Sequence, residues 1–232
     1  MTKITERGMI FNAEMVRALL SGRKTQTRRI MKPQPEPCPR GGHWWPSNVF
    51  KTMLHVEDEM QNGKGGWGGL VGDACPFGAV GDRIWVRETW GVVSHAFSDD
   101  GLMIDWVPDR PATAIHEMPF GNGYYSGYAI YAADGDFTWG DDDGYEDGRS
   151  CWKPSIHMPR AASRILLEIT DVRVERLRSM SQDDARAEGV IAASGPMEAG
   201  LAFRELWDSI YGEESWKANP WVWVIKFKRM RS

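Results

Sequence analysis

The sequence predicts a mixed α+β protein, built as a small β-barrel with peripheral helices and long loop insertions. Several short segments alternate between apolar and polar residues, which is typical of strands. Other segments place apolar residues at helical spacing between a capping residue and a glycine. Gly-rich stretches without periodicity separate these blocks. One domain over residues 1–232, with insertions at about 40–74 and 91–149, accounts for the length.

The helices are predicted from their end signals. They are expected over about residues 13–21, 181–188 and 197–211. Asn12 can cap the first, and Gly22 suits the left-handed residue that ends many helices. Ser181 with Asp184 three residues later forms a capping box for the second, and Gly189 follows it. The apolar residues of each segment recur on one side, so each helix has a face to bury.

The strands are predicted from alternation. They are expected over residues 24–31, 83–90, 124–132, 164–170, 172–177 and 221–228. In the last of these, Trp221, Trp223, Ile225 and Phe227 alternate with smaller or charged residues, which predicts one bulky face. Residues 40–80 and 134–150 are Gly-rich or acidic and are expected to be loops, and residues 91–122 remain ambiguous.

Composition excludes several classes of protein. The chain is 42% hydrophobic and 26% charged, with a net charge of −4, so unselective binding to polyanions is not expected. No apolar run is long enough for a membrane helix, and the start lacks the apolar centre of a signal peptide. The three cysteines are widely spaced and odd in number, which favours reduced thiols and a cytoplasmic protein.

The segment from Gly22 to Arg29 is the first candidate site. Four of its eight residues are the cations Arg23, Lys24, Arg28 and Arg29, and two are threonines. Where a helix gives way to a strand, backbone amides and cations can hold a phosphate or a base edge. A basic helix terminus that satisfies its own carbonyls is the alternative. Lys24 and Thr27 can reach one ligand only if Lys24 lies in the turn before the strand.

A second candidate group combines arginines with aromatic and polar residues. Its members are Arg83, Arg87, Glu88, Trp90, Lys153, Ser155, His157, Arg160 and Arg164. Arginine offers planar donors to phosphate or guanine, and tryptophan offers a stacking face, so a shared cleft would suit a nucleotide. An Arg–Glu ion pair beside a core tryptophan is the alternative. Arg87 and Glu88 are adjacent and would face opposite sides of a strand.

Four residues of the first insertion are candidate zinc ligands. Cys38, His43, His55 and Cys75 have the side chains that zinc prefers, although they lack the usual Cys-x2-Cys pairs. Loosely placed loop residues are the alternative, and no other cofactor is expected. The acidic run from Asp141 to Asp143 lacks the spacing of an EF-hand calcium loop.

Three motifs resemble the ASCH family, which has the PUA-like fold. The Gly22-Arg-Lys-Thr-Gln-Thr-Arg segment after a helix is similar to the signature near the start of ASCH domains, and the Gly81-Asp-Arg-Ile-Trp run resembles their second strand. Phage and prophage ASCH proteins of about this size also look like this chain around Lys153 to Arg160. Many of those have Trp where this chain has Ala161. The resemblance covers residues 8–32, 75–90 and 150–190 and implies a barrel with a cleft beside its helices.

One branch of that family removes the acetyl group from N4-acetylcytidine. Its catalytic Lys, Thr and Glu match Lys24, Thr27 and Glu188 in this chain. The resemblance therefore implies Thr27 as nucleophile, Lys24 as the base that takes its proton, and Glu188 as an orienting group. From spacing alone, an exposed helix residue beside Gly189 is the favoured interpretation of Glu188.

Three functions follow, in this order of preference. The first is a module that binds RNA or a modified nucleotide in the cleft, through the residues named above. The second is an amidohydrolase that acts on an acylated nucleoside. The third is a phage-type interaction protein whose aromatic and acidic insertions bind a host protein.

Overall fold

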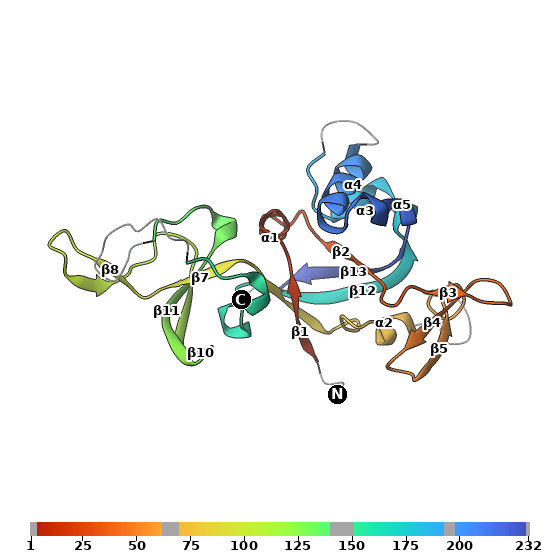
Figure 1. Ribbon diagram of the computed structural model, residues 1–232, viewed down its shortest axis with the longest axis horizontal. Helices are drawn as coiled ribbons and strands as arrows, with labels where there is room; N and C mark the ends of the chain where they lie inside the picture. Colours follow the sequence, from red (N-terminus) through yellow and green to blue (C-terminus); the bar gives the residue numbers. More distant parts are fainter. Residues whose placement is uncertain (1–3, 62–69, 140–150, 193–197, 231–232) are drawn as a thin grey trace. The chain divides into compact units, whose positions relative to one another are not determined.

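The computed structural model describes residues 4–61, 70–139, 151–192 and 198–230. The chain folds into two compact units. Unit 1 comprises Met1–Arg7, Ala18–Ile84 and Leu167–Ser232, and unit 2 comprises Gly8–Arg17 and Trp85–Leu166. Strands predominate and helices accompany them (Figure 1), so the mixed α+β class expected from the sequence is confirmed. None of the helices in the described ranges is both long and apolar enough to span a membrane.

The largest sheet has five strands in the order β1-β6-β12-β13-β2 (Figure 1). Its strands are β1 (Glu6–Ile10), β2 (Gln26–Ile30), β6 (Arg83–Arg87), β12 (Leu166–Arg176) and β13 (Trp221–Arg229). Strand β13 pairs antiparallel with both β12 and β2, so it joins segments that are far apart in the sequence. The strands described by the structure form four separate sheets, none of which closes into a barrel.

The helix boundaries follow the end signals closely. The described helices are α1 (Ala13–Leu20), α2 (Leu70–Ala74), α3 (Gln182–Ala187), α4 (Glu198–Tyr211) and α5 (Glu213–Ala218). Asn12 accepts a backbone hydrogen bond at the start of α1, and Ser181 and Asp184 form the expected capping box of α3. Helix α5 was not predicted, because Gly212 suggested an end. Its φ of 82° does end α4, and the same residue then caps α5.

Strand β13 is buried on both faces over its first five residues, whereas its pattern predicts a single bulky face. On one face Val222 and Val224 share a core with Phe203 and Trp207 of α4. On the other face Trp223 packs edge-on against Trp45, with 5.4 Å between ring centroids. The helices therefore cover the side of the sheet that the smaller valines leave open.

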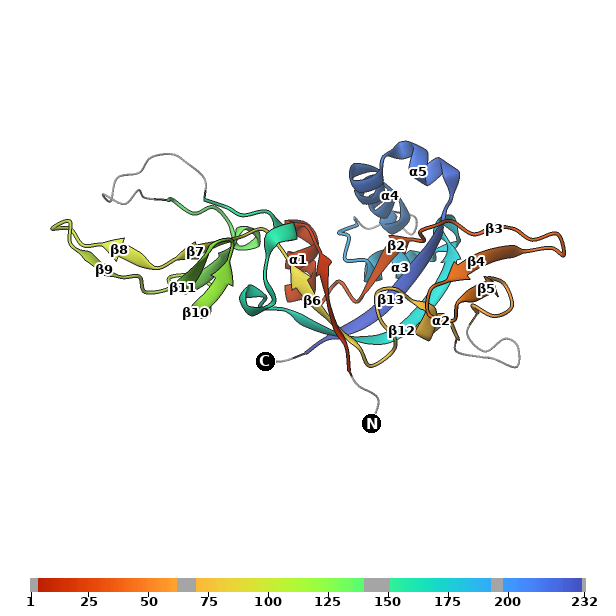
Figure 2. The same ribbon diagram turned by 60° about the horizontal axis from the view of Figure 1, so that its bottom comes forward.

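Part of the expected loop at residues 40–80 is a sheet. Strands β3 (Glu36–Pro37), β4 (His43–Ser47) and β5 (Thr52–His55) form it in that order (Figure 2). Trp45 and Leu54 are opposite each other in the register and both are buried. The loop expectation is wrong here because glycine and proline hide a short alternation of apolar residues. Residues 62–69 lie outside the described ranges.

Unit 2 contains a three-stranded antiparallel sheet in the order β10-β11-β7. Its strands are β7 (Trp90–Val93), β10 (Thr113–Phe120) and β11 (Gly123–Tyr131), and β8 (His95–Phe97) and β9 (Met103–Asp105) form a separate hairpin. The expected strand over 124–132 is confirmed by β11. The expected strand over 83–90 is interrupted at residues 88 and 89, which separate β6 from β7. Met197 and most of the acidic loop, residues 140–150, lie outside the described ranges.

Candidate functional site

The turn between α1 and β2 places Lys24 ahead of the strand. Gly22 has a φ of 77°, as expected of a residue that ends a helix. The amide of Lys24 donates to the carbonyl of Ala18 at 3.0 Å, and the amide of Thr25 donates to the carbonyl of Ala187 at 2.8 Å. Thr27 lies within β2. The expected arrangement, with Lys24 in the turn and Thr27 in the strand, is confirmed.

The side chain of Lys24 is buried against the end of α3. Its Nζ lies 2.9 Å from Oε2 of Glu188 and donates to the backbone carbonyl of the same residue at 2.9 Å. Burial lowers the pKa of the Lys24 amine below its ordinary value, and the carboxylate of Glu188 opposes that shift. A buried amine with a lowered pKa is suited to accept a proton.

Gly189 makes this approach possible. Its φ is 89°, and a Cβ added to it would lie 2.7 Å from the Cβ of Lys24 and 2.8 Å from that of Ala18. The sequence predicts Gly189 only as the residue that ends a helix. In the structure the same glycine also leaves the space that the Lys24 side chain occupies.

Arg28 joins Glu188 to a second set of charges. Its Nη1 lies 2.9 Å from Oε1 of Glu188, and its Nη2 lies 2.5 Å from Oε1 of Glu175 and 3.6 Å from Oδ2 of Asp184. The Arg28 side chain is fully buried. It contacts the Phe203 ring at 5.8 Å, which helps to fix the guanidinium plane.

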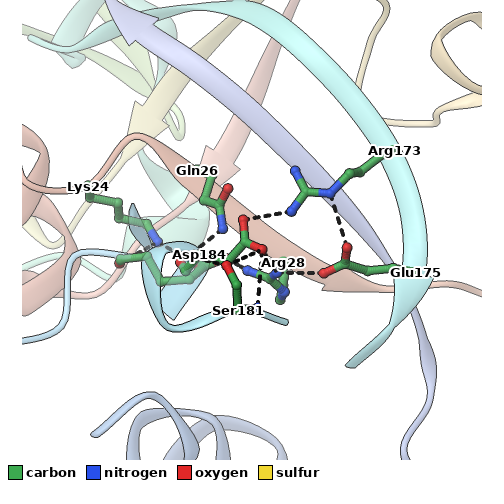
Figure 3. A network of polar contacts seen from close by, with 8 residues as sticks. Lys24, Gln26, Arg28, Arg173, Glu175, Ser181 and Asp184 are labelled. Carbon is green, nitrogen blue, oxygen red and sulfur yellow. Dashed lines mark hydrogen bonds and ion pairs between the residues drawn. The ribbon is translucent and has the colours of Figure 1, made fainter. Parts of the chain in front are cut away.

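Arg173 completes the network shown in Figure 3. Its Nε lies 3.0 Å from Oε2 of Glu175, and its Nη2 lies 2.7 Å from Oδ1 of Asp184. The neighbouring cations Arg173 and Arg28, with hydrogen bonds from Ser181, lower the pKa of Asp184 to about 2 although burial opposes this. The network contains three cations and three carboxylates, namely Lys24, Arg28, Arg173, Glu175, Asp184 and Glu188. Its charges therefore balance when Lys24 is protonated.

Two buried polar atoms in this region have no hydrogen-bond partner among the described residues. They are Oε1 of Gln26 and Nε of Arg28. The Gln26 side chain donates through its Nε2 to the carbonyl of Asp184 at 3.0 Å, which leaves its oxygen as an unused acceptor. One acceptor and one donor at alternate positions of β2 lie on the same face of the strand. A ligand with a donor beside an acceptor would satisfy both.

Thr27 lies on the other face of β2, because side chains alternate along a strand. It is opposite Ile225 in the register with β13 and is only 1% exposed. Of the three residues matched to the amidohydrolase signature, the structure brings Lys24 and Glu188 into contact. The side chain of Thr27 lies on the opposite face of β2 from those of Gln26 and Arg28.

The remaining cations of the segment have different surroundings. Arg23 is exposed, and its guanidinium donates to the Ser21 hydroxyl and to the carbonyl of Gly189, each at 3.2 Å. Arg29 is half-buried opposite Trp223. Arg23 thus donates to one carbonyl, that of Gly189 after α3, and to none of its own helix, whereas Lys24 and Arg28 are held by carboxylates.

In unit 2 the second candidate group contains an ion pair and a core tryptophan. Arg164 binds both oxygens of Glu88 at 3.0 Å, and Asp134 at 2.7 Å. Its guanidinium carbon lies 3.9 Å from the centroid of the Tyr131 ring. Trp90 is fully buried and packs edge-on against Phe120, so its faces are occupied by the core. Sequence reasoning weighed an Arg–Glu pair here without assigning the partner of Glu88.

The other members of that group are spread over unit 2. Arg87 stacks on Trp85 at 5.2 Å and donates to the carbonyl of Ile156, and Lys153 lies over the Tyr125 ring at 5.2 Å. Three further members remain accessible: Ser155 is half-buried, and His157 and Arg160 are exposed. Arg83 belongs to unit 1 and pairs with Glu6 at 3.4 Å.

The candidate zinc ligands have other partners. Nδ1 of His43 lies 2.6 Å from Glu57, and Nδ1 of His55 lies 2.9 Å from Asp58. Cys38 is buried, and burial raises the pKa of Cys75 to about 12, which keeps that thiol protonated. Within the described ranges, no group of three or more His, Cys, Asp or Glu side chains is arranged to hold a metal ion.

Sequence reasoning missed Gln26, Arg173 and Glu175 as parts of the site and saw Asp184 only as a cap. Alternation along β2 could have placed Gln26 beside Arg28, whereas no local signal marks the other two. Comparison with known proteins adds no assignment: no protein-family model matches the chain, and neither a curated protein nor a solved structure matches it.

Proposed function

We propose that the chain is an ASCH-type, PUA-like protein that hydrolyses the acyl amide of an N4-acylated cytidine. The observation that supports this best is the buried amine of Lys24, 2.9 Å from the carboxylate of Glu188. These two residues are 164 positions apart in the sequence, and the family resemblance pairs them in one site. The sheet with α3 and α4 on one face is the part of the chain that we assign to the PUA-like fold.

In the proposed reaction, neutral Lys24 takes the proton of the Thr27 hydroxyl as its oxygen attacks the acyl carbonyl. The tetrahedral intermediate collapses when the bond to N4 breaks, and Lys24 returns the proton to the leaving amine. Water then hydrolyses the acyl-threonine ester. Glu188 holds the Lys24 amine in place between these steps. Thr27 lies on the face of β2 opposite Gln26 and Arg28. The mechanism therefore requires the Lys24 amine and the Thr27 hydroxyl to come into contact on that face.

The test is turnover of N4-acetylcytidine by the full chain. Lys24→Ala should lower the rate of cytidine release by at least about 100-fold, because the proton acceptor is lost. Lys217→Ala, which removes an exposed lysine, is the matched control and should leave the rate unchanged. Absence of cytidine release by the unaltered protein would reject this function for that substrate.

Binding of RNA or a modified nucleotide without hydrolysis is the second candidate. The unpaired Gln26 oxygen and Arg28 Nε favour it, because a base edge can supply a donor beside an acceptor. The exposed Arg23, which belongs to the same unit, would add a phosphate contact. Affinity for a short RNA should then fall with added salt and in Arg23→Ala, whereas salt-insensitive or absent binding would favour a protein partner.

We place the protein in the cytoplasm on the basis of its cysteines. All three are unpaired, and two of them are buried. Zinc binding at the first insertion and a host-protein partner remain predictions from the sequence.

A further inference from the structure

Arg28 and the five other charged side chains of its network form one connected series. Each of the three carboxylates contacts two cations. Glu188 lies between Lys24 and Arg28, and Glu175 lies between Arg28 and Arg173. Asp184 contacts the same two arginines, at 3.6 Å and 2.7 Å. Lys24 is therefore one end of the series and Arg173 is the other.

Arg28 is the link between these ends. Its Nη1 faces Glu188, and its Nη2 faces Glu175 and Asp184. A guanidinium is planar and rigid, so a force on one nitrogen displaces the other. Arg173 and Arg28 bind different oxygens of both Glu175 and Asp184, so each carboxylate bridges the two arginines. Arg173 therefore helps to hold the two carboxylates that Nη2 of Arg28 faces, while Nη1 of Arg28 faces Glu188.

We propose that Arg173 is a positioning residue, which acts through Glu175, Asp184 and Arg28 to set how strongly Glu188 holds the amine of Lys24. The proposal rests on the proposed function only for its catalytic consequence, because its physical content is the protonation of Lys24. The ion pairs of Arg173 are with Glu175 and Asp184, and its side chain is 22% exposed. It is the part of the series that solvent can reach.

The direction of the effect follows from charge. The charged groups that face Lys24 are Glu188, Arg28 and Arg29, and the six-residue series is neutral when Lys24 is protonated. Without Arg173 the series is left with one excess negative charge, which favours the protonated amine and raises the pKa of Lys24. Removing the charge of Glu175 leaves one excess positive charge, so the pKa of Lys24 falls.

The experiment titrates Lys24 directly by nuclear magnetic resonance of protein with ¹³C-labelled lysine side chains. The Lys24 signal is the one that disappears in Lys24→Ala. Arg173→Met should move its midpoint to higher pH, and Glu175→Gln should move it to lower pH, each by about 0.5–1 pH unit. Arg173→Lys, which keeps the charge, should restore most of the original midpoint.

The control is Arg186→Met, which removes an exposed cation from α3 two residues before Glu188. Its midpoint should stay within about 0.2 pH unit of the unaltered protein, because an exposed charge is screened. Shifts of the same sign in Arg173→Met and Glu175→Gln would overturn the proposal, as would a shift in Arg186→Met as large as that in Arg173→Met. A Lys24 signal that does not titrate in any variant would also overturn it. If Arg173→Met does not fold, Glu175→Gln and Arg173→Lys still decide.

Hydrolysis is followed in the same samples. If the proposed function holds, the pH at which cytidine release reaches half its maximum should move with the Lys24 midpoint. If the Lys24 midpoint shifts in opposite directions in the two variants but no cytidine is released, the proposed hydrolysis is rejected and the role of Arg173 stands. If cytidine is released but the Lys24 midpoint does not move, the role of Arg173 is rejected and the proposed hydrolysis stands.

Discussion

Both units bury an arginine between two carboxylates, yet the two clusters differ in what completes them. In unit 1, Arg28 lies between Glu188 and Glu175, and the series ends in Lys24, whose pKa is lowered by burial. In unit 2, Arg164 lies between Glu88 and Asp134 and stacks on Tyr131. Of these two clusters, the first contains an amine whose pKa burial lowers, and the second contains no amine.

The cluster of unit 1 is suited to chemistry, whereas the cluster of unit 2 is suited to holding the structure together. The arginine of unit 2 stays charged at all ordinary pH values, and burial raises the pKa of Tyr131 and that of Glu88 above their ordinary values. A cluster of this kind fixes the strands around it. The cluster of unit 1 holds a buried amine whose charge depends on its neighbours, which is the property of a catalytic base.

The largest effect is expected from breaking the ion pair of unit 2. Arg164→Met leaves the buried Glu88 without its bidentate partner, which should destabilise unit 2 by about 3–5 kcal/mol. Arg173→Met in unit 1 should cost less, because Glu175 and Asp184 keep their contacts with Arg28. Hydrogen exchange measured on peptides from β11 and β13 reports the two units separately. If Arg164→Met and Arg173→Met destabilise their own units equally, the proposed difference between the two clusters is wrong.

Glycine substitutions in the two units should differ in their effect on Lys24. Gly189→Ala and Gly127→Ala both force a Cβ into contacts of 2.7 Å or less at positive φ, so each should cost about 1–3 kcal/mol. Gly189→Ala should also displace Lys24 and reduce hydrolysis, whereas Gly127→Ala, which meets the backbone of β7, should leave the Lys24 titration unchanged. Gly22→Ala, with open space around it, controls for strain alone. A normal rate in Gly189→Ala would remove the role given to that glycine.

Acid should affect the two clusters in opposite directions. The folded-state pKa of Glu88 is raised, so its contribution to stability is fully present below its ordinary pKa of 4.5 and is lost as pH rises through the folded value. The folded-state pKa of Asp184 is about 2, so its contribution is present above 3.8 and is lost as pH falls toward 2. The second loss should be about 1–2 kcal/mol.

Unfolding by urea at a series of pH values checks this prediction. Glu88→Gln should abolish the gain of stability on acidification, and Asp184→Asn should abolish the loss below pH 4. A stability profile unchanged in both variants would show that neither carboxylate responds as its surroundings imply.

Local rules predicted α1, α3 and α4, because caps and stops act within a few residues, but they predicted neither α2 nor α5 and missed several strands, including β1, β3 and β10. Asn12, Ser181 and Gly189 each have the role that the sequence assigns to them. The two-sided burial of β13 depends on α4 and on Trp45, which no local pattern reveals. The expected loop at 40–80 failed for the same reason, since its short strands are stabilised by residues outside the segment.

The site was less accessible to sequence reasoning than the fold. Lys24 and Glu188 were paired through the family resemblance, not through spacing. Arg28 and its partner Glu175 are 147 residues apart in the sequence, and Arg164 and its partner Glu88 are 76 residues apart. Which acid meets which base at such separations is decided by the packing of sheets and helices. Strand alternation constrained only the side of β2 on which Thr27 lies.

The smallest effect is expected from the helix caps, where the two units can be compared at matched positions. Ser181→Ala and Asn12→Ala each remove a side chain that accepts a backbone amide at the start of a helix, which should cost about 1 kcal/mol in each case. The Ser181 hydroxyl also donates to Asp184 at 3.0 Å. Losing that bond should raise the pKa of Asp184 toward 3.8, so the loss of stability in acid should begin at higher pH in Ser181→Ala. Asn12→Ala should leave the loss of stability in acid at its original pH, because the Asn12 side chain caps α1 by accepting from the Met15 amide. If both variants lose stability at the same pH in acid, the cap of α3 is independent of the cluster around Arg28.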